Sequence, residues 1–307
     1  MVDGLLLVDK QAGCTSHDVV QQVRRLMRQR RIGHCGTLDP DATGLLLLTL
    51  GQATRLTRFL IRAPKEYEGR LRLGIATDTY DASGRPTAER STAGVEESHL
   101  GREMRAFVGS YAQVPPPYCA KKIGGEKYYE LARRGEATPD EPKEVEIYAF
   151  EPAGPLADDR LAFRLACESG TYARSLVHDL GERLGCGAHL ERLRRTRIGP
   201  FALDDALPVA TLGERRAAAA PLGPAWLPLD EIPLPFATTV ADAAQERRLL
   251  HGQTILTRQL DGMEGDWVRI ADRRGRLLAI GSVVERLGGS GMVVIQPKIV
   301  FPAPALC

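Results

Sequence analysis

The stretch GHCGTLDPDATGLL, residues 33–46, places two carboxylates in a short glycine-rich loop. It stands directly before an apolar run at 45–48 that is typical of a buried strand. Asp39 precedes Pro40, and an Asp-Pro pair in such a loop is most often a turn. The same loop also presents a carboxylate beside a core strand, where an acid, base or nucleophile would be held rigidly. Asp39 is therefore a candidate catalytic residue, with Asp41 as the competing carboxylate.

The metal-ligating residue types show no recognisable spacing. Asp39 and Asp41 lack a third ligand, and the six cysteines form neither a C-x-x-C pair nor a zinc pattern. We therefore predict no metal, and reduced thiols in a cytoplasmic protein. No apolar run approaches the length of a membrane span, and MVDGLLLVDK lacks the basic region and cleavage site of a signal peptide.

Two further residues could act together with Asp39. The segment GTYARSLVHDLGERLG, residues 170–185, has the apolar spacing of a helix, with Thr171 suited to the N-cap. Arg174 then lies in the first turn, where the helix dipole favours anions. A carboxylate partner would explain that position, and so would simple exposure to solvent. Tyr67, in KEYEG, begins an alternating strand; such a tyrosine usually serves packing and becomes functional only in a pocket shared with Asp39.

The net charge is only +2, but arginine is concentrated in two segments. Residues 24–31 carry the first cluster, and RLRRTR, residues 192–197, carries the second; a smaller pair, KK, lies at 121–122. Arginine forks match phosphate geometry. Each cluster alone is equally compatible with a solvated face, but together they favour a polyanionic ligand.

Elements that could position these residues follow from the hydrophobic pattern. With 307 residues, 43% of them hydrophobic, the chain can form two domains with substantial cores. The pattern predicts a helix capped by Ser16 and others at 54–61, 96–107, 128–133 and 171–184. It predicts strands at 4–10, 45–50, 67–75, 145–150 and 161–167, and a hairpin at 124–125. Because no regular β-α-β order emerges, the predicted class is α+β with a mixed, largely antiparallel sheet.

The composition changes at residues 217–235, where four alanines are followed by a proline-rich stretch. Short strands with glycine-rich turns are predicted beyond it, at 267–270, 277–284 and 292–295, as in a small β-barrel-like module. We place the domain boundary here, which divides the chain into 1–235 and 236–307.

Five segments, in order over residues 4–201, resemble motifs of the TruB family of tRNA pseudouridine synthases. GHCGTLDPDATGLL is similar to the family's G-H-x-G-[ST]-L-D-P-x-A-T-G-[LM]-L. GLLLVDKQAGCTSHDVV is similar to its opening strand and K-P-x-G-x-[ST]-S motif, with Gln11 where proline is usual. The others are KEYEGRLRLGIATDTYDASG, PPPYCAKKIGGEKYYELARRG (Cys119 replaces the usual serine) and CESGTYARSLVHDLGERLGCGAHLERLRRTRIGPF.

This resemblance implies a pseudouridine synthase fold, in which a mixed sheet with flanking helices bears a catalytic cleft. Residues 1–235 would form the catalytic domain and 236–307 a PUA-like RNA-binding domain. Asp39 matches the catalytic aspartate of the family. Tyr67 matches the tyrosine that stacks on the target base and is proposed to take the C5 proton, and Arg174 matches the arginine that pairs with the catalytic carboxylate.

Further residues match positions that face the base or the RNA in the family. Tyr172 adjoins the pocket, Leu193 lines it, and His34 helps to hold the flipped tRNA loop. Lys10 matches a motif lysine with a structural or RNA-facing role. From the arginine cluster, Arg194 and Arg195 are expected to contact the RNA backbone.

The implied function is isomerisation of the T-loop uridine of tRNA, position 55, to pseudouridine. The N1–C1′ bond breaks and C5 is joined to C1′ without redox change or phosphate transfer, so no cofactor is expected. The base must be flipped out of its stack to be reached. The expected partner is the T-arm of tRNA, bound by a monomer that needs no protein partner.

Two alternatives share this scaffold: a non-catalytic RNA-binding or RNA-folding module, and an RNA-guided subunit that depends on protein partners. The complete set of aspartate, tyrosine and arginine favours catalysis, since binding alone needs no buried carboxylate. The bacterial-type motifs and the lack of lysine-rich extensions favour the stand-alone enzyme.

Overall fold

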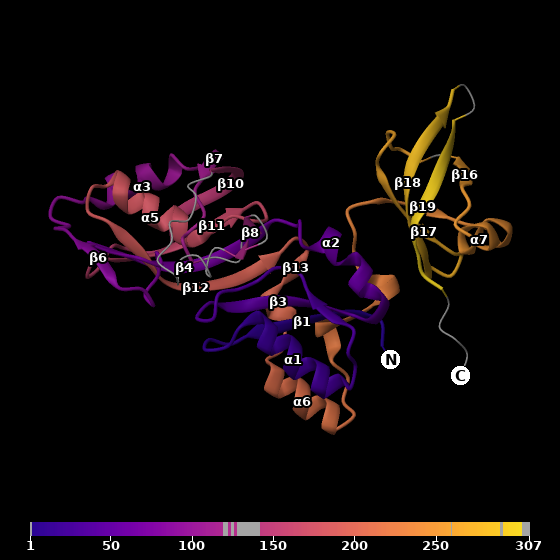
Figure 1. Cartoon of the computed structure of the whole chain (residues 1–307), viewed down its shortest axis with the longest axis horizontal. Helices are drawn as coiled ribbons and strands as arrows, with labels where there is room; N and C mark the ends of the chain where they lie inside the picture. Colours follow the sequence, from indigo (N-terminus) through magenta and orange to yellow (C-terminus); the bar gives the residue numbers. More distant parts are fainter. Residues whose placement is uncertain are drawn as a thin grey trace.

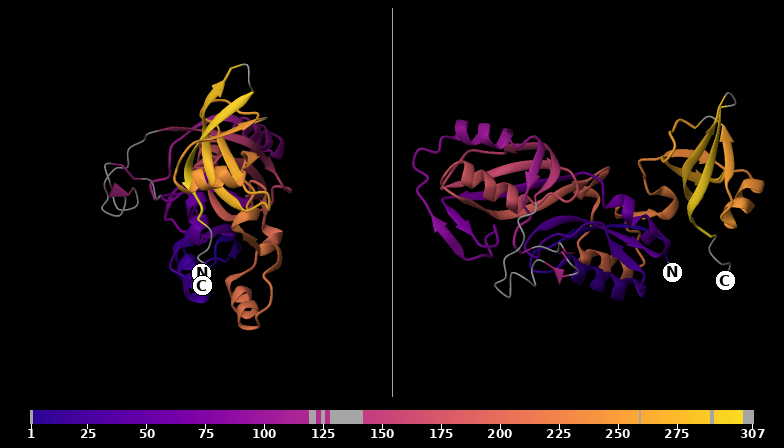
Figure 2. Two further views of the ribbon diagram at one scale, coloured as in Figure 1. Left: turned by 90° about the vertical axis from the view of Figure 1, so that its right-hand side faces the viewer. Right: turned by 45° about the horizontal axis from the view of Figure 1, so that its top comes forward.

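The computed structural model describes residues 2–118, 122–123, 126–127, 142–258, 260–288 and 291–302. Two sheets organise the described chain, a ten-stranded sheet and, later in the sequence, a five-stranded sheet (Figure 1). In the right-hand view of Figure 2 the two parts lie side by side, with the later strands at one end of the molecule.

The large sheet contains strands from the whole of the first 228 residues. They are β1 (Gly4–Lys10), β2 (Ile32–His34), β3 (Thr43–Leu50), β4 (Lys65–Leu73), β7 (Gly109–Gln113), β10 (Lys143–Pro152), β11 (Arg160–Cys167), β12 (Ala188–Ile198), β13 (Phe201–Ala202) and β14 (Trp226–Pro228). Their order is β14-β1-β3-β12-β4-β11-β10-β7, with β2 beside β3 and β13 beside β12. The described pairs are antiparallel except β3 with β12, which is parallel. The predicted α+β class with a mixed, largely antiparallel sheet is confirmed.

Helices cover the sheet in two groups. On β1 and β3, alternate side chains point to opposite faces: one face packs on α1 (Ser16–Met27) and α6 (Val209–Ala217), and the other on η1 (Gly51–Leu56) and α2 (Thr57–Leu60). Further along, α3 (Glu97–Arg105) and α5 (Ala173–Arg183) pack on the apolar face of β4, β10 and β11. The first turns of α1 and α5 both reach the loop between β2 and β3, since Ser16 contacts Leu38 and Arg174 contacts Asp39.

The second sheet has its own apolar core and begins at Ala237. Its strands are β15 (Ala237–Val240), β16 (Ile255–Arg258), β17 (Trp267–Ala271), β18 (Leu277–Leu287) and β19 (Met292–Val300), in the order β15-β17-β18-β19-β16, with helix α7 (Ala243–Leu250) beside them. One apolar cluster joins it to the first part, since Ile280 and Phe301 pack in the same cluster as Leu5. Arg55 reinforces this contact by donating to the carbonyl of Val300 at 2.5 Å.

Ser16 does not cap α1 as the sequence predicted; Thr15 does. Thr15 Oγ1 accepts from the backbone N–H of Asp18, and the Asp18 carboxylate accepts from the N–H of Thr15. This reciprocal pair satisfies two helix-terminal donors. The Ser16 hydroxyl is buried and is used instead on a loop, where it accepts from the N–H of Leu38 at 2.9 Å.

Other predicted elements also differ in their bounds, and three of them lie close to the site. The strand predicted at 67–75 ends at Leu73, because Gly74 has φ +84° and the chain turns into β5 (Ile75–Thr77), which pairs with β6 (Pro86–Glu89). Segment 54–61 is partly a 3-10 turn, and α5 begins at Ala173 with Tyr172 at its N-cap. Thr171 is not the cap, because its hydroxyl donates to the carbonyl of Glu168.

The predicted hairpin is confirmed in its strands, since β8 (Lys122–Ile123) pairs antiparallel with β9 (Glu126–Lys127). The helix predicted at 128–133 and Lys121 of the small basic pair lie outside the described residues.

Candidate active site

The loop that carries Asp39 connects β2 to β3, and two buried side chains form hydrogen bonds with its backbone. Ser16 binds the backbone of Leu38 from the first turn of α1. Lys10, fully buried at the end of β1, donates its ammonium to the carbonyls of Pro40 at 2.9 Å and Ala42 at 2.6 Å. The loop is therefore fixed on both sides of Asp39 by hydrogen bonds to its backbone.

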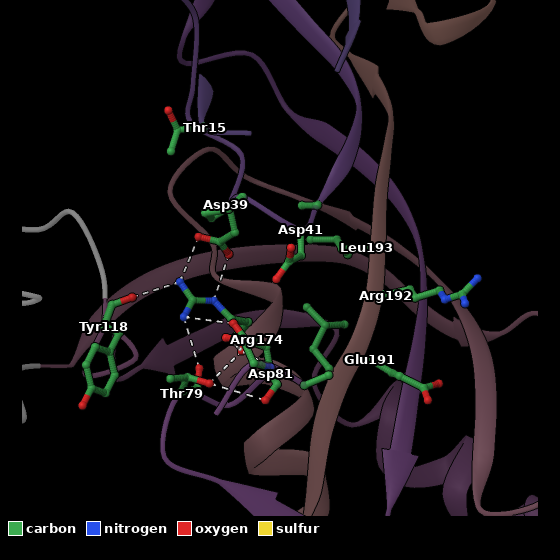
Figure 3. Close-up of a pocket in the computed structure, with 15 residues that line it drawn as sticks. Thr15, Asp39, Asp41, Thr79, Asp81, Tyr118, Arg174, Glu191, Arg192 and Leu193 are labelled. Atoms are coloured by element: carbon green, nitrogen blue, oxygen red, sulfur yellow. Dashed lines mark hydrogen bonds and ion pairs between the residues drawn. The ribbon is translucent and has the colours of Figure 1, made fainter. Parts of the chain in front are cut away.

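Arg174 pairs with Asp39 through a fork. Nη2 donates to Asp39 Oδ1 at 3.1 Å, and Nε lies 2.9 Å from Oδ2 (Figure 3). Arg174 is 5% exposed although it stands in the first turn of α5, so the carboxylate partner, and not solvent exposure, accounts for its position. The sequence interval of 135 residues is bridged by the packing of α5 against the central sheet.

The same guanidinium is also held from its far side. Nη1 donates to the carbonyl of Thr79 at 3.1 Å and lies 3.5 Å from Asp81 Oδ2, while Nη2 donates to the carbonyl of Tyr118 at 3.1 Å. Asp81 was not among the predicted site residues. The signal was present in the polar turn DTYDASG, which supplies both Thr79 and Asp81.

Asp39 lies in a recess, with 43% of its side chain open and protein close around the remainder. Burial raises its pKa above the ordinary range, the Arg174 guanidinium lowers it, and the Asp81 carboxylate raises it. Arg174 therefore offsets part of the cost of desolvating this carboxylate.

Two cavities meet at this ion pair. One of about 520 Å³ extends toward Thr15, Asp81 and Tyr118, and the other, of about 340 Å³, extends toward Tyr67 and Tyr172. Asp39, Arg174 and Leu193 line both of them. The fold thus brings together six of the predicted site residues around adjoining spaces, each of a size suited to a small planar group and its sugar.

Tyr67 stands in the smaller cavity on β4, directly opposite Arg195 on β12. Burial raises the pKa of the Tyr67 phenol, and the neighbouring Arg195 guanidinium lowers it. Lys65, two residues earlier, lines the same cavity; burial, together with the Arg195 guanidinium, lowers its pKa to about 8. The condition for a functional Tyr67, a space shared with Asp39, is met.

Arg195 and Lys10 are not placed to contact an RNA backbone. Arg195 is 1% exposed, and its guanidinium donates to the carbonyls of Gly36, Thr37 and Leu45. The chain can approach this closely because Gly44 has no side chain, since a Cβ there would lie 2.3 Å from the Arg195 carbonyl. Both cations support the loop that carries Asp39 by satisfying its carbonyls.

The remaining predicted residues lie at the margin. Arg194 is 40% exposed and pairs with Asp9 at 3.0 Å. His34 lines neither cavity; it is half-buried at the end of β2, and burial lowers its pKa. Arg192, a member of the arginine cluster at 192–197, is exposed and points away from Asp39 (Figure 3).

The described residues contain no group of three or more histidine, cysteine, aspartate or glutamate side chains arranged to hold a metal ion. Within the same ranges, no helix is long and apolar enough to cross a membrane. The four cysteines described, Cys14, Cys35, Cys167 and Cys186, are free thiols.

Comparison with known proteins assigns the chain to a family. Residues 24–173 match the sequence model of the TruB family pseudouridylate synthase N-terminal domain, and residues 174–232 match that of the tRNA pseudouridylate synthase B C-terminal domain. The chain is 39% identical to tRNA pseudouridine synthase B of Solibacter usitatus, over 92% of this chain and 96% of that protein. It is also 39% identical to the protein of that name from Heliobacterium modesticaldum, over 98% of this chain and 96% of that protein.

Solved structures show the same fold. The protein in an H/ACA ribonucleoprotein bound to a substrate RNA containing 2′-deoxyuridine superposes with a TM-score of 0.75 at 24% identity, covering 98% of this chain and 85% of that one. A chain of a Cbf5-Nop10-Gar1 complex superposes with a TM-score of 0.74 at 25% identity, covering 97% of this chain and 84% of that one. From the family models and the extent of identity, the chain belongs to the TruB family of pseudouridylate synthases.

Proposed function

We propose that this protein isomerises the T-loop uridine of tRNA, position 55, to pseudouridine, with Asp39 as the catalytic carboxylate. The observation that carries the proposal is the Asp39–Arg174 fork, which stands between two cavities, one of them lined by Tyr67. The family supports the reaction class, and the relatives that bear the name tRNA pseudouridine synthase B support the substrate.

The chemistry needs a carboxylate at the ribose or base and a group that receives the C5 proton. The N1–C1′ bond breaks, the uracil rotates, C5 joins C1′, and the C5 proton is lost while N1 gains one, so atoms and electrons balance. Asp39 supplies the carboxylate as nucleophile or base. Arg174 favours its ionised form and fixes its orientation, which a carboxylate in a recess requires.

Tyr67 is positioned to stack on a uracil that has left the RNA helix. Flipping the base costs roughly a few kcal/mol, and stacking on an aromatic ring returns about 1–3 kcal/mol. Its raised pKa keeps the phenol protonated near neutral pH. Tyr67 would therefore receive the C5 proton only after its own proton has passed to N1 of the uracil, which gains a proton in the reaction, and the adjacent Arg195 guanidinium would stabilise the phenolate in between. Tyr172 and Leu193 complete the walls of this cavity.

The tRNA T-arm would lie across the mouth of the site, where exposed arginines such as Arg192 meet its phosphates. His34 and Arg194, at the margin, would face the RNA loop. In this proposal residues 1–235 act as the catalytic domain, and residues 236–307 as a PUA-like RNA-binding domain. The protein would act as a monomer in the cytoplasm without a protein partner.

A second candidate is suggested by the structural neighbours, which come from an H/ACA ribonucleoprotein and from a Cbf5-Nop10-Gar1 complex. An RNA-guided subunit would require such partners before it could act. The experiment therefore uses the purified protein alone with an isolated T-arm stem-loop. Turnover under these conditions excludes the guided subunit.

The test measures tritium released from [5-³H]uridine in that stem-loop. Wild type is expected to release it, and Asp39→Asn is expected to bind the RNA with unchanged affinity but to release none. Asp41→Asn is the matched control, because Asp41 lies in the same loop but makes no ion pair with Arg174. Release by Asp39→Asn at the wild-type rate would refute the assignment, and tight binding without release by wild type would favour the binding module.

A further inference from the structure

Two aromatic rings outside the cavities are stacked behind Arg174. The Tyr80 and His178 rings lie parallel, with centroids 3.7 Å apart and an interplanar angle of 8°. Tyr80 stands between Thr79 and Asp81, the two residues that hold the far side of Arg174. His178 lies on α5, one helical turn after Arg174. The stack therefore ties the Thr79–Asp81 turn to the same helix that carries Arg174.

The backbone at Tyr80 is in an unfavourable conformation. Its φ is +63°, a left-handed value that costs a bulky residue about 1–2 kcal/mol. The conformation is secured on the backbone side, where the Tyr80 carbonyl accepts from the N–H of Leu190 at 3.0 Å. Such strain persists only where surrounding contacts compensate for it. Here it turns the Thr79 carbonyl and the Asp81 carboxylate toward Arg174.

The histidine is held as a neutral ring. Burial lowers the pKa of His178, and Arg90 lowers it too, while Asp179 and Glu182 raise it. Both carboxylates are engaged elsewhere: Asp179 accepts from the Tyr111 hydroxyl, and Glu182 pairs with Arg90 at 3.0 Å. A neutral imidazole can lie flat on the phenol without the cost of desolvating a charge.

We propose that the Tyr80–His178 stack is a positioning pair for the reaction, which keeps Thr79 and Asp81 on Arg174 and so keeps the Arg174 fork aligned on Asp39. Neither ring lines either cavity, so the pair acts through Arg174 and not on the substrate. This inference rests on the proposed function for its kinetic readout. It predicts an effect on the chemical step and not on RNA binding.

The test compares His178→Ala, which removes the stack, with His178→Phe, which keeps a flat ring on Tyr80. His178→Ala is expected to lower kcat about twofold to tenfold, the range of an aromatic pair, with KM unchanged. His178→Phe is expected to keep most of kcat. The double variant Tyr80→Ala/His178→Ala should cost little more than either single change, because the pair acts as one unit. His99→Ala, an exposed histidine on α3, is the control and should match wild type.

A His178→Ala enzyme with wild-type kcat would overturn the proposal, and so would His178→Phe as impaired as His178→Ala. A loss confined to KM would also overturn it. If wild type releases no tritium, the proposed function fails separately, and the stack is tested by carboxyl ¹³C NMR of Asp39. The Asp39 pKa is then expected to rise in His178→Ala as Arg174 loosens; an unchanged value would overturn the proposal.

Discussion

Replacing Arg174 by lysine tests whether the geometry of the fork, and not merely a positive charge, drives the reaction. A lysine can offer Asp39 one ammonium, but it cannot reach both carboxylate oxygens in a plane and also bind Thr79 and Tyr118. The loss of one charge-assisted hydrogen bond corresponds to about 1.5–3 kcal/mol. At about 1.4 kcal/mol per factor of ten, Arg174→Lys should lower kcat by about 10- to 100-fold.

The pH dependence gives this prediction a second, independent readout. In the proposed mechanism turnover requires ionised Asp39, so activity should be lost as the pH falls through its pKa. That pKa is already raised by burial, and Arg174 opposes the rise. Arg174→Lys should therefore shift the acid limb of kcat to higher pH. The Thr79 and Tyr118 carbonyls also lose a donor, which should lower Tm.

Single-turnover tritium release from the T-arm stem-loop, followed from pH 5 to 8, measures the chemical step without product release. Arg183→Lys on the same helix is the control, because Arg183 lies over Phe107 and away from Asp39. A kcat within threefold of wild type, or a loss confined to KM, would refute the reasoning that the fork orients and ionises Asp39.

Three other outcomes follow from the buried and exposed cations. Lys10→Met should lower Tm and kcat together, because it removes the donor to two loop carbonyls, and a wild-type Tm would contradict this. Arg192→Gln should raise KM and reduce the dependence of KM on salt concentration, because Arg192 is exposed. Arg195→Gln should instead lower kcat and Tm, because Arg195 is buried. If the KM of both variants depended equally on salt concentration, this difference in exposure would not explain their roles. Because the pKa of Lys65 is lowered from 10.5 to about 8, the unfolded chain binds more protons between these values. The unfolding free energy of wild type relative to Lys65→Met should therefore rise with pH over that window in urea titrations.

Local patterns in the sequence were sufficient for the fold class and for many of the elements. Apolar spacing identified α1, α3 and α5 and strands such as β1, β3 and β4, because burial of one face imposes its period on the residues. It did not identify the central strand β12, or helices α6 and α7. The predicted helix ends were wrong where a side chain that could cap the helix forms a hydrogen bond with another residue. Ser16 is bound to Leu38 and Thr171 to Glu168, and neither choice can be read from helix propensity.

The residue types of the site were likewise determined by the sequence: a carboxylate in a glycine loop, a misplaced arginine and a strand tyrosine. Only the tertiary structure decided that they meet, since the ion pair joins residues 39 and 174 through the packing of α5 on the central sheet. It also decided which arginines of the cluster are exposed. β12 is irregular at Leu190–Arg192 and at Arg195–Arg197, so simple alternation does not apply, and Arg195 is buried while Arg192 faces solvent. Long-range contacts of this kind depend on how whole elements pack, which no local period encodes.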